Sequence, residues 1–81
     1  MTLLYFAWVR QKIGKGEEKL TAPAADVAAL IAHLKGLGPN YADAFADLSR
    51  IRVAVNQRHV ALDSKIGSDD EVAFFPPVTG G

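Results

Sequence analysis

Cysteine is absent from this chain of 81 residues. Without a thiol the protein can have no disulfide framework, no thiolate metal site and no cysteine nucleophile, and it cannot carry sulfur as a persulfide. Long apolar runs are absent too. None approaches the ~20 residues of a membrane-spanning helix, and the first residues lack the basic region and small-residue cleavage site of a secretory signal. The sequence therefore predicts a cytoplasmic protein that does not enter a membrane.

An excess of one charge is also missing, because nine Lys and Arg residues balance nine Asp and Glu residues. Nucleic-acid-binding proteins carry a basic footprint that meets the phosphates, so we expect no nucleic-acid partner. The chain is long enough for one domain and too short for two. Hydrophobic residues make up 49% of it and charged residues 22%, which is typical of a folded globular domain rather than a disordered chain.

Most motifs of catalysis and of metal or cofactor binding are missing as well. The glycines around Lys15 lack the third glycine of a dinucleotide-binding loop, and the chain has no phosphate-binding loop of the GxxxxGK[ST] type. We expect His33 to lie at the surface of a helix, and His59 to lie at the surface or against a partner. The carboxylates at 69–71 indicate a solvated turn. The sequence thus predicts that the chain itself binds no cofactor and no metal ion.

Hydrophobic spacing predicts two helices, a helical turn over residues 9–13 and five strands. The clearer helix follows Asp26, an N-cap residue, and the shorter one follows Asn40 and extends to Leu48. Apolar residues of the first helix recur at i, i+3, i+4 and i+7, which places them on one face: they are Val27, Leu30, Ile31 and Leu34. Bulky or alternating apolar residues predict the strands: Thr2–Trp8, Glu17–Ala22, Ile51–Val55, His59–Leu62 and Glu71–Phe75.

The first and last strands are apolar on both faces, which is typical of strands in the middle of a sheet. Side by side they run parallel, and the main helix then covers one face of a mixed sheet. This arrangement predicts the α+β class and the β-grasp, or ubiquitin-like, architecture: about five strands covered on one face by one main helix plus a short helix. We expect a single domain over residues 1–75 and a flexible C-terminal tail over residues 76–81.

The tail has a composition suited to chemistry rather than to packing. Its residues are Pro76, Pro77, Val78, Thr79, Gly80 and Gly81. Two prolines cannot continue a central strand, and six extended residues span at most roughly 20 Å. A C-terminal glycine presents a carboxylate with no Cβ beside it, which can enter a narrow channel in another protein's active site. There ATP can convert the carboxylate into an acyl-adenylate, and attack by a sulfur nucleophile would leave a thiocarboxylate on Gly81.

A candidate partner surface follows from the alternation of the last strand. If Val72 and Phe74 face the helix, Phe75 lies on the opposite face, for which the chain has no second covering helix. Phe75 and Phe6, on neighbouring strands, would then form an exposed apolar patch beside the tail. Exposed aromatic patches usually mark interfaces; the alternative is a second small core sealed under a loop. We expect two polar residues at the rim of the patch: Arg10 and His59.

The C-terminal segment from Asp70 to Gly81, DEVAFFPPVTGG, resembles the signature of the small subunit of molybdopterin synthase, a family of ubiquitin-like sulfur carriers. Phe6–Arg10 is similar to the family's opening strand and turn, and Ala54–Gln57 to its hairpin. The resemblance covers the whole chain. Departures lie around residues 14–16, in the alanine-rich helix and at His59, where the family often carries an apolar residue.

The resemblance implies a sulfur carrier in molybdenum cofactor biosynthesis. A ubiquitin-activating-like adenylyltransferase would use ATP to adenylate Gly81, and a sulfurtransferase system would deliver sulfur. The resulting thiocarboxylate would enter the large subunit of the synthase, which would carry the catalytic side chains. Two transfers would build the dithiolene of molybdopterin. The family assembly is a heterotetramer, with a small subunit at each end of a large-subunit dimer.

Two other interpretations of the residues stay open. The same tail chemistry would serve a sulfur carrier of another pathway, such as thiamine synthesis or tRNA thiolation. A ubiquitin-like domain can also be a non-covalent interaction module whose terminus is never activated, since fold alone does not fix function. The segment over residues 74–79, Phe-Phe-Pro-Pro-Val-Thr, favours the molybdopterin synthase family over other sulfur carriers.

Overall fold

The computed structural model describes residues 1–21 and 25–77, and nine elements of secondary structure lie within them. Five are strands: β1 (Thr2–Tyr5), β2 (Glu17–Lys19), β3 (Arg52–Val55), β4 (Arg58–Val60) and β5 (Glu71–Phe75). Three are α-helices, α1 (Ala7–Ile13), α2 (Val27–Lys35) and α3 (Pro39–Ala44), and one is a 3₁₀ helix, η1 (Leu48–Arg50).

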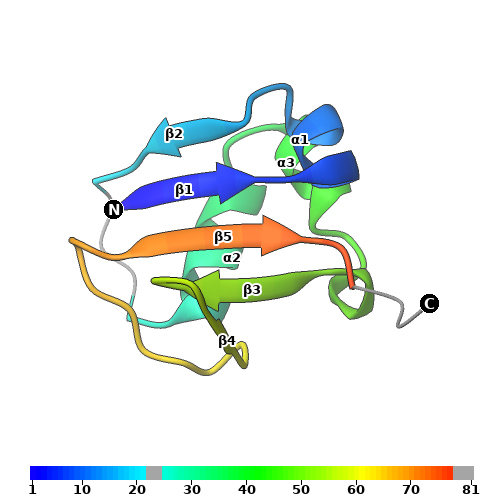
Figure 1. The fold of residues 1–81 in the computed structure, drawn as a ribbon. Helices are drawn as coiled ribbons and strands as arrows, with labels where there is room; N and C mark the ends of the chain where they lie inside the picture. Colours follow the sequence, from blue (N-terminus) through cyan, green and yellow to red (C-terminus); the bar gives the residue numbers. More distant parts are fainter. Residues whose placement is uncertain (22–24, 78–81) are drawn as a thin grey trace.

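The five strands form one mixed sheet in the order β2-β1-β5-β3-β4 (Figure 1). β1 and β5 are parallel neighbours at its centre, and the other pairs of these strands are antiparallel. In Figure 1, α2 lies behind the sheet, and α1 and α3 lie beyond the end of β1. The β-grasp architecture predicted from the two-sided apolar strands is therefore confirmed.

The core lies between the helix-covered face of the sheet and α2. Five of its side chains, from the central strands and from α2, have 0% exposure: Leu3, Val72, Phe74, Leu30 and Leu34. The Phe74 ring meets Phe45 edge to face, with centroids 5.0 Å apart, and stacks with Tyr5 at 6.0 Å. Full burial of an apolar side chain of this size stabilises the fold by about 1.5–3 kcal/mol, so these few residues supply much of the stability.

The main helix, α2, begins as its sequence predicts. The Asp26 carboxylate accepts a hydrogen bond from the Ala29 amide at 2.8 Å, which satisfies one of the free donors of the first turn. The helix ends at Lys35, with Gly36 as its C-cap residue. Its apolar face is buried against the sheet, while Ala28, Ala32 and His33 lie on its exposed side.

The first predicted strand is too long, because it ends at Tyr5 rather than at Trp8. Ala7 has a φ of 53°, and this left-handed residue turns the chain directly into α1. Val9 and Ile13 are buried four residues apart, on one face of a helix with a period of about 3.6 residues, so the end of the apolar run belongs to this helix. Trp8 lies in α1 and is half-buried, and the Arg50 guanidinium lies 5.1 Å above its ring.

The predicted second helix is also revised. It begins at Pro39 with Gly38 as N-cap, because proline at the first helical position has no amide hydrogen to leave unpaired. Asn40 does not cap this helix; its side chain donates to the Ile13 carbonyl at 2.8 Å, at the end of α1. Beyond Ala44 the helix does not continue to Leu48, because Asp47 accepts hydrogen bonds from the Ser49 amide and hydroxyl and starts η1.

Candidate functional site

The sheet face opposite the helices carries side chains that no described helix covers. Cross-strand register places Leu4 opposite Ala73, Ala73 opposite Ala54, and Ala54 opposite His59. Because side chains alternate along each strand, this face also receives Phe75. We call these five residues, Leu4, Ala54, His59, Ala73 and Phe75, the open face. It is turned toward the reader in Figure 1.

Phe75 and His59 meet across the open face. Their ring centroids lie 5.3 Å apart, with an angle of 35° between the rings. The two residues belong to β5 and β4, which are separated by β3. The contact runs diagonally across β3, because Phe75 pairs with Arg52 whereas His59 pairs with Ala54, whose side chain is small. Ala54 is only 7% exposed although it belongs to the open face, as expected if both rings shield it.

Phe6 continues the alternation of β1 at the end of the sheet from which the tail leaves. Its side chain is 49% exposed, the largest exposed fraction among the large hydrophobic residues that the structure describes. Its amide donates to the Phe74 carbonyl at 3.1 Å, which places Phe6 beside the end of β5. The structure thus brings Phe6 to the same end of the sheet as Phe75, as the sequence analysis expected.

Arg10 and His59 do not come together. Arg10 lies on α1, which follows β1, and its guanidinium rests against the loop before β2: a Cβ built on Gly16 would lie 3.2 Å from Arg10 Nε. His59 lies on β4, the strand at the opposite edge of the sheet. Arg10 therefore lies near the β2 edge of the sheet and His59 at the β4 edge, so the two residues are not neighbours.

The stem of the tail begins where β5 ends. Pro76 and Pro77 follow Phe75 directly, and both are half-buried. Val78, Thr79, Gly80 and the predicted reactive residue Gly81 lie outside the described residues. The stem continues β5, a strand of the open face. For a partner that binds this face, the tail therefore always starts from the same place, the end of β5.

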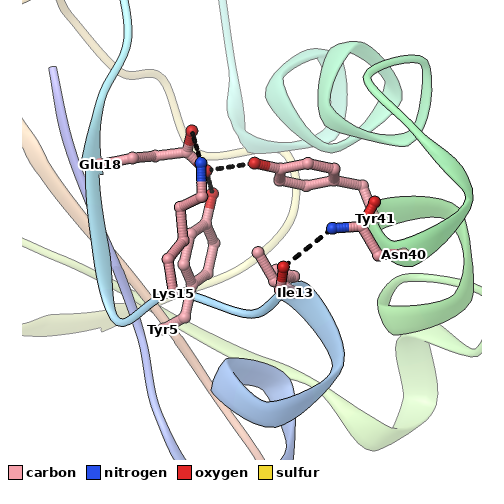
Figure 2. A network of polar contacts seen from close by, with 6 residues as sticks. All are labelled: Tyr5, Ile13, Lys15, Glu18, Asn40 and Tyr41. Atoms are coloured by element: carbon pink, nitrogen blue, oxygen red, sulfur yellow. Dashed lines mark hydrogen bonds and ion pairs between the residues drawn. The ribbon is translucent and has the colours of Figure 1, made fainter.

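A polar network centred on Glu18 connects Tyr5 at the end of β1 to Tyr41 of α3 (Figure 2). The hydroxyls of Tyr5 and Tyr41 donate to the same oxygen of Glu18, Oε2, at 2.7 and 2.8 Å. The Lys15 ammonium lies 3.6 Å from the other oxygen. Burial raises the pKa of both tyrosine hydroxyls, and their hydrogen bonds to the Glu18 carboxylate raise it further. The network joins β1, β2 and α3.

The sequence analysis missed this network. Glu18 lies in the predicted strand Glu17–Ala22, whose residues the sequence analysis assigns to no face. Alternation places Glu18 on the same side as Leu20, and Glu18 pairs with Leu3 of the core. A carboxylate at a core-facing position needs hydrogen-bond donors. The alternation of the strand is therefore the sequence pattern that predicts a buried partner for Glu18. Nothing in the local sequence identifies Tyr5 and Tyr41 as those donors.

The part of the chain that the structure describes contains neither a cluster of metal-ligating side chains nor a membrane-spanning helix. Within residues 1–21 and 25–77, no group of three or more His, Asp or Glu side chains is arranged to hold a metal ion. The longest described helix, α2, has nine residues, and none of the described helices combines the length and apolar character that crossing a membrane requires.

The chain resembles known proteins over nearly its whole length. Residues 3–81 match the model of the ThiS family. The molybdopterin synthase sulfur carrier subunit of Escherichia coli strain K12 is 40% identical over 79 residues, which cover 98% of this chain and 96% of that protein. A solved structure from Pyrococcus furiosus, assigned as molybdopterin converting factor subunit 1, is 32% identical, has a TM-score of 0.77, and is covered to 95%, as is this chain.

A third match concerns an assembly. A complex of subunits 1 and 2 of the molybdopterin-converting factor from Helicobacter pylori 26695 contains a chain of the same fold, with a TM-score of 0.64 and 20% identity. The alignment covers 99% of this chain and 96% of that one. At this level of identity the match shows the fold alone; in that protein the fold is found in contact with a second subunit.

Proposed function

This chain belongs to the ThiS family, and from that premise we propose that it is the sulfur carrier subunit of a molybdopterin synthase. The observation that carries the proposal is the 40% identity, over 98% of the chain, to a protein of that name. Two features of the chain support it: an open face with the half-buried Phe75 and with the exposed Phe6 at its end, and a stem that leads from this face to a Gly-Gly terminus.

The reactive group would be the carboxylate of Gly81. One of its oxygens attacks the α-phosphorus of ATP in a ubiquitin-activating-like adenylyltransferase, which forms the acyl-adenylate and releases pyrophosphate. A sulfur nucleophile supplied by a sulfurtransferase system then attacks the carbonyl carbon, and AMP leaves. Since the chain contains no cysteine, its terminus is its only site for carrying sulfur. ATP is bound by the partner, and this chain supplies the acyl group.

The open face, together with Phe6, would be the docking surface for the large subunit of the synthase. Aromatic residues near the centre of an interface contribute most of the binding free energy in many complexes, and Phe75 and Phe6 are the half-buried and exposed aromatics here. Docking fixes the stem, and six extended residues then deliver the terminus at most roughly 20 Å away. Binding and sulfur donation are thus performed by separate parts of the chain.

The adenylyltransferase and the large subunit both need the same terminus, so they bind the carrier in turn. The active-site side chains that act on the pterin belong to the large subunit. A heterotetramer, with one carrier at each end of a large-subunit dimer, fits this division, since each carrier needs only one docking surface.

Removal of Gly81 tests the proposal. The shortened chain is expected to fold and to bind the large subunit, but to support no sulfur transfer. Deletion of one residue retracts the carboxylate by roughly 3.3–3.6 Å, beyond the ~3–3.5 Å separation that a positioned attack requires. Pyrophosphate exchange with the adenylyltransferase and pterin conversion with the large subunit are the two measurements. Addition of one alanine after Gly81 is the matched control for length, and it should fail in both. Full activity without Gly81 would contradict the proposal.

The intact mass of the carrier purified from its native host separates the remaining interpretations. A sulfur-for-oxygen exchange at the terminus supports sulfur carriage and excludes a purely non-covalent interaction module. Co-purification then identifies the pathway: the large subunit of molybdopterin synthase is expected, and a thiamine-synthesis or tRNA-thiolation enzyme in its place would assign the carrier to that pathway instead.

A further inference from the structure

A cavity of about 210 Å³ lies between α1, α3 and η1, beyond the end of the sheet from which the tail leaves. Three of its lining residues are apolar and come from α1, from α3 and from the loop after α3: Trp8, Ala44 and Ala46. The other four are two cations and two carboxylates, so their formal charges cancel: Lys12, Arg50, Asp43 and Asp47. The cavity thus combines apolar walls with a charged rim that has no net charge.

The pairing of the strands places this cavity beside the exit of the tail. At the end of β5, Phe75 pairs with Arg52, the first residue of β3 after η1. On the other side of β5, the amide of Phe6 donates to a carbonyl of β5, at the point where β1 gives way to α1. The chain beyond β5 therefore leaves between the start of α1 and the end of η1. Trp8 and Arg50 belong to these two segments, and the guanidinium lies 5.1 Å from the centroid of the indole ring.

The backbone at Ala7 directs Trp8 into the cavity. In a continuing strand Trp8 would lie on the same side as Phe6, because side chains alternate. The left-handed conformation of Ala7, with a φ of 53°, ends the strand instead, so that Phe6 is exposed beside the open face while Trp8 lines the cavity. Backbone strain of this kind persists where the surrounding structure holds it, and it is common at functional sites. One turn thus supplies an aromatic residue to each of two adjoining surfaces.

We infer that the docking surface extends past Phe6 into this cavity, and that the large subunit inserts an apolar side chain there. This rests on the proposed function. A partner that takes the tail into its active site surrounds the tail where it leaves the carrier, so the mouth of its channel covers Trp8 and Arg50. A charged side chain would lose its water at a rim without net charge, whereas an apolar one gains by excluding water from Trp8 and the two alanines. Tryptophan and arginine are also enriched among the residues that dominate binding.

Trp8 reports directly on the cavity, because it is the only tryptophan in the chain. Full-length carrier labelled with fluorotryptophan gives one fluorine NMR signal, to which the unlabelled large subunit adds none. Formation of the complex is expected to shift this signal, since the inserted side chain replaces water beside the indole ring. An unchanged signal in the formed complex would overturn the inference.

Two substitutions change the cavity itself. Ala46→Phe fills it from an exposed position, and Trp8→Ala removes its largest wall. Each is expected to weaken binding of the full-length carrier to the large subunit about tenfold or more in calorimetric titration. Ala32→Phe is the matched control, because Ala32 is exposed on α2 behind the sheet, and it should bind as the unmodified carrier does. Unchanged affinity in either cavity variant would overturn the inference. So would a loss of pyrophosphate exchange alone, which would assign the cavity to the adenylyltransferase.

Phe75→Asp separates this inference from the docking proposal itself. If Phe75→Asp binds the large subunit as the unmodified carrier does, the open face is not the docking surface. If Phe75→Asp weakens binding while the Trp8 signal of the unmodified complex stays unchanged, the docking surface stands but ends before the cavity. Circular dichroism of each variant verifies that it is folded.

Discussion

The two sides of β5 show how one apolar segment supplies both a core and a surface. Val72 and Phe74 have 0% exposure beneath the helices, whereas Ala73 and Phe75, their immediate neighbours in sequence, remain partly exposed on the open face. Hydropathy does not distinguish the two pairs. The strand alternation does, because helices cover only one face of the sheet. Apolar character therefore indicates that a side chain becomes buried. Only the register of the strand shows whether the chain's own core or a partner protein buries it.

The largest difference is expected between the same substitution on the two sides. Phe74→Asp should unfold the protein, because loss of a buried Phe costs about 3–5 kcal/mol and the charge adds to it, against a total stability of roughly 4–12 kcal/mol for a chain of this length. Phe75→Asp should remain folded and lose about 2 kcal/mol or more of docking free energy. Thermal melts and titration with the large subunit measure the two effects. The opposite pattern would mean that the faces are assigned one residue out of register.

Truncation to alanine gives a smaller version of the same contrast. Leu30→Ala and Leu34→Ala should each lower the free energy of unfolding by about 2–5 kcal/mol, since both side chains are fully buried in the core. Phe6→Ala should cost less than about 1 kcal/mol, because half of that side chain already contacts water. Urea unfolding of the three variants measures this. Equal losses at Phe6 and Leu30 would show that Phe6 belongs to a sealed second core.

Both central strands and the main helix could be predicted from the sequence, because their signals are local. The two-sided apolar strands give the centre of the sheet, and Asp26 followed by a stripe of apolar residues gives α2. The start of α1 could not be predicted. The apolar run passes through it without interruption, and the left-handed conformation of Ala7 has no marker in the residue type.

In the candidate site, too, some features could be predicted from local sequence patterns and others could not. Phe75 could be placed on the open face from the alternation of its own strand. The contact between Phe75 and His59 could not, because it requires the strand order and the diagonal register of the two residues across β3. The Glu18 network likewise joins residues separated by 13 and 23 positions in sequence, and only the folded chain brings them together.

Alkaline pH should lower the free energy of unfolding through the two tyrosines on the helix-covered side of the sheet. The open face should not contribute to this loss. The pKa values of Tyr5 and Tyr41 are raised in the folded protein, by burial first and then by the Glu18 carboxylate. A group whose pKa is raised on folding stabilises the fold fully below its unfolded pKa, near 10 for tyrosine, and this contribution is lost as the pH rises above that value. Urea unfolding between about pH 8 and 11 should show the decline.

Tyr5→Phe is the control for this decline, because it keeps the ring stacked on Phe74 and removes the hydroxyl. The free energy of unfolding of this variant should fall less steeply above about pH 10 than that of the unmodified protein. An identical slope in both proteins would mean that Tyr5 does not contribute to the alkaline loss.

The smallest effect is expected at the turn that carries His59 onto the open face. Asn56 and Gln57 connect β3 to β4 as a two-residue hairpin with φ values of 52° and 70°, the pattern of a type I′ turn, which favours Asn-Gly. Asn56 suits its position, and its side chain also bonds to Asp70 and to the Glu71 amide. Gln57 is exposed, and its left-handed backbone conformation costs a non-glycine residue about 1–2 kcal/mol.

Gln57→Gly should therefore stabilise the protein slightly. The relief of about 1–2 kcal/mol at this φ is set against the roughly 0.5–1 kcal/mol that glycine costs through the flexibility of the unfolded chain, which leaves a net gain of up to about 1.5 kcal/mol. Gln57→Ala keeps the left-handed strain and serves as the control, so its free energy of unfolding should not rise. Docking to the large subunit should be the same in both variants, because Gln57 lies outside the open face. A loss of stability in Gln57→Gly would show that the Gln57 side chain makes a contact that outweighs the strain of its backbone.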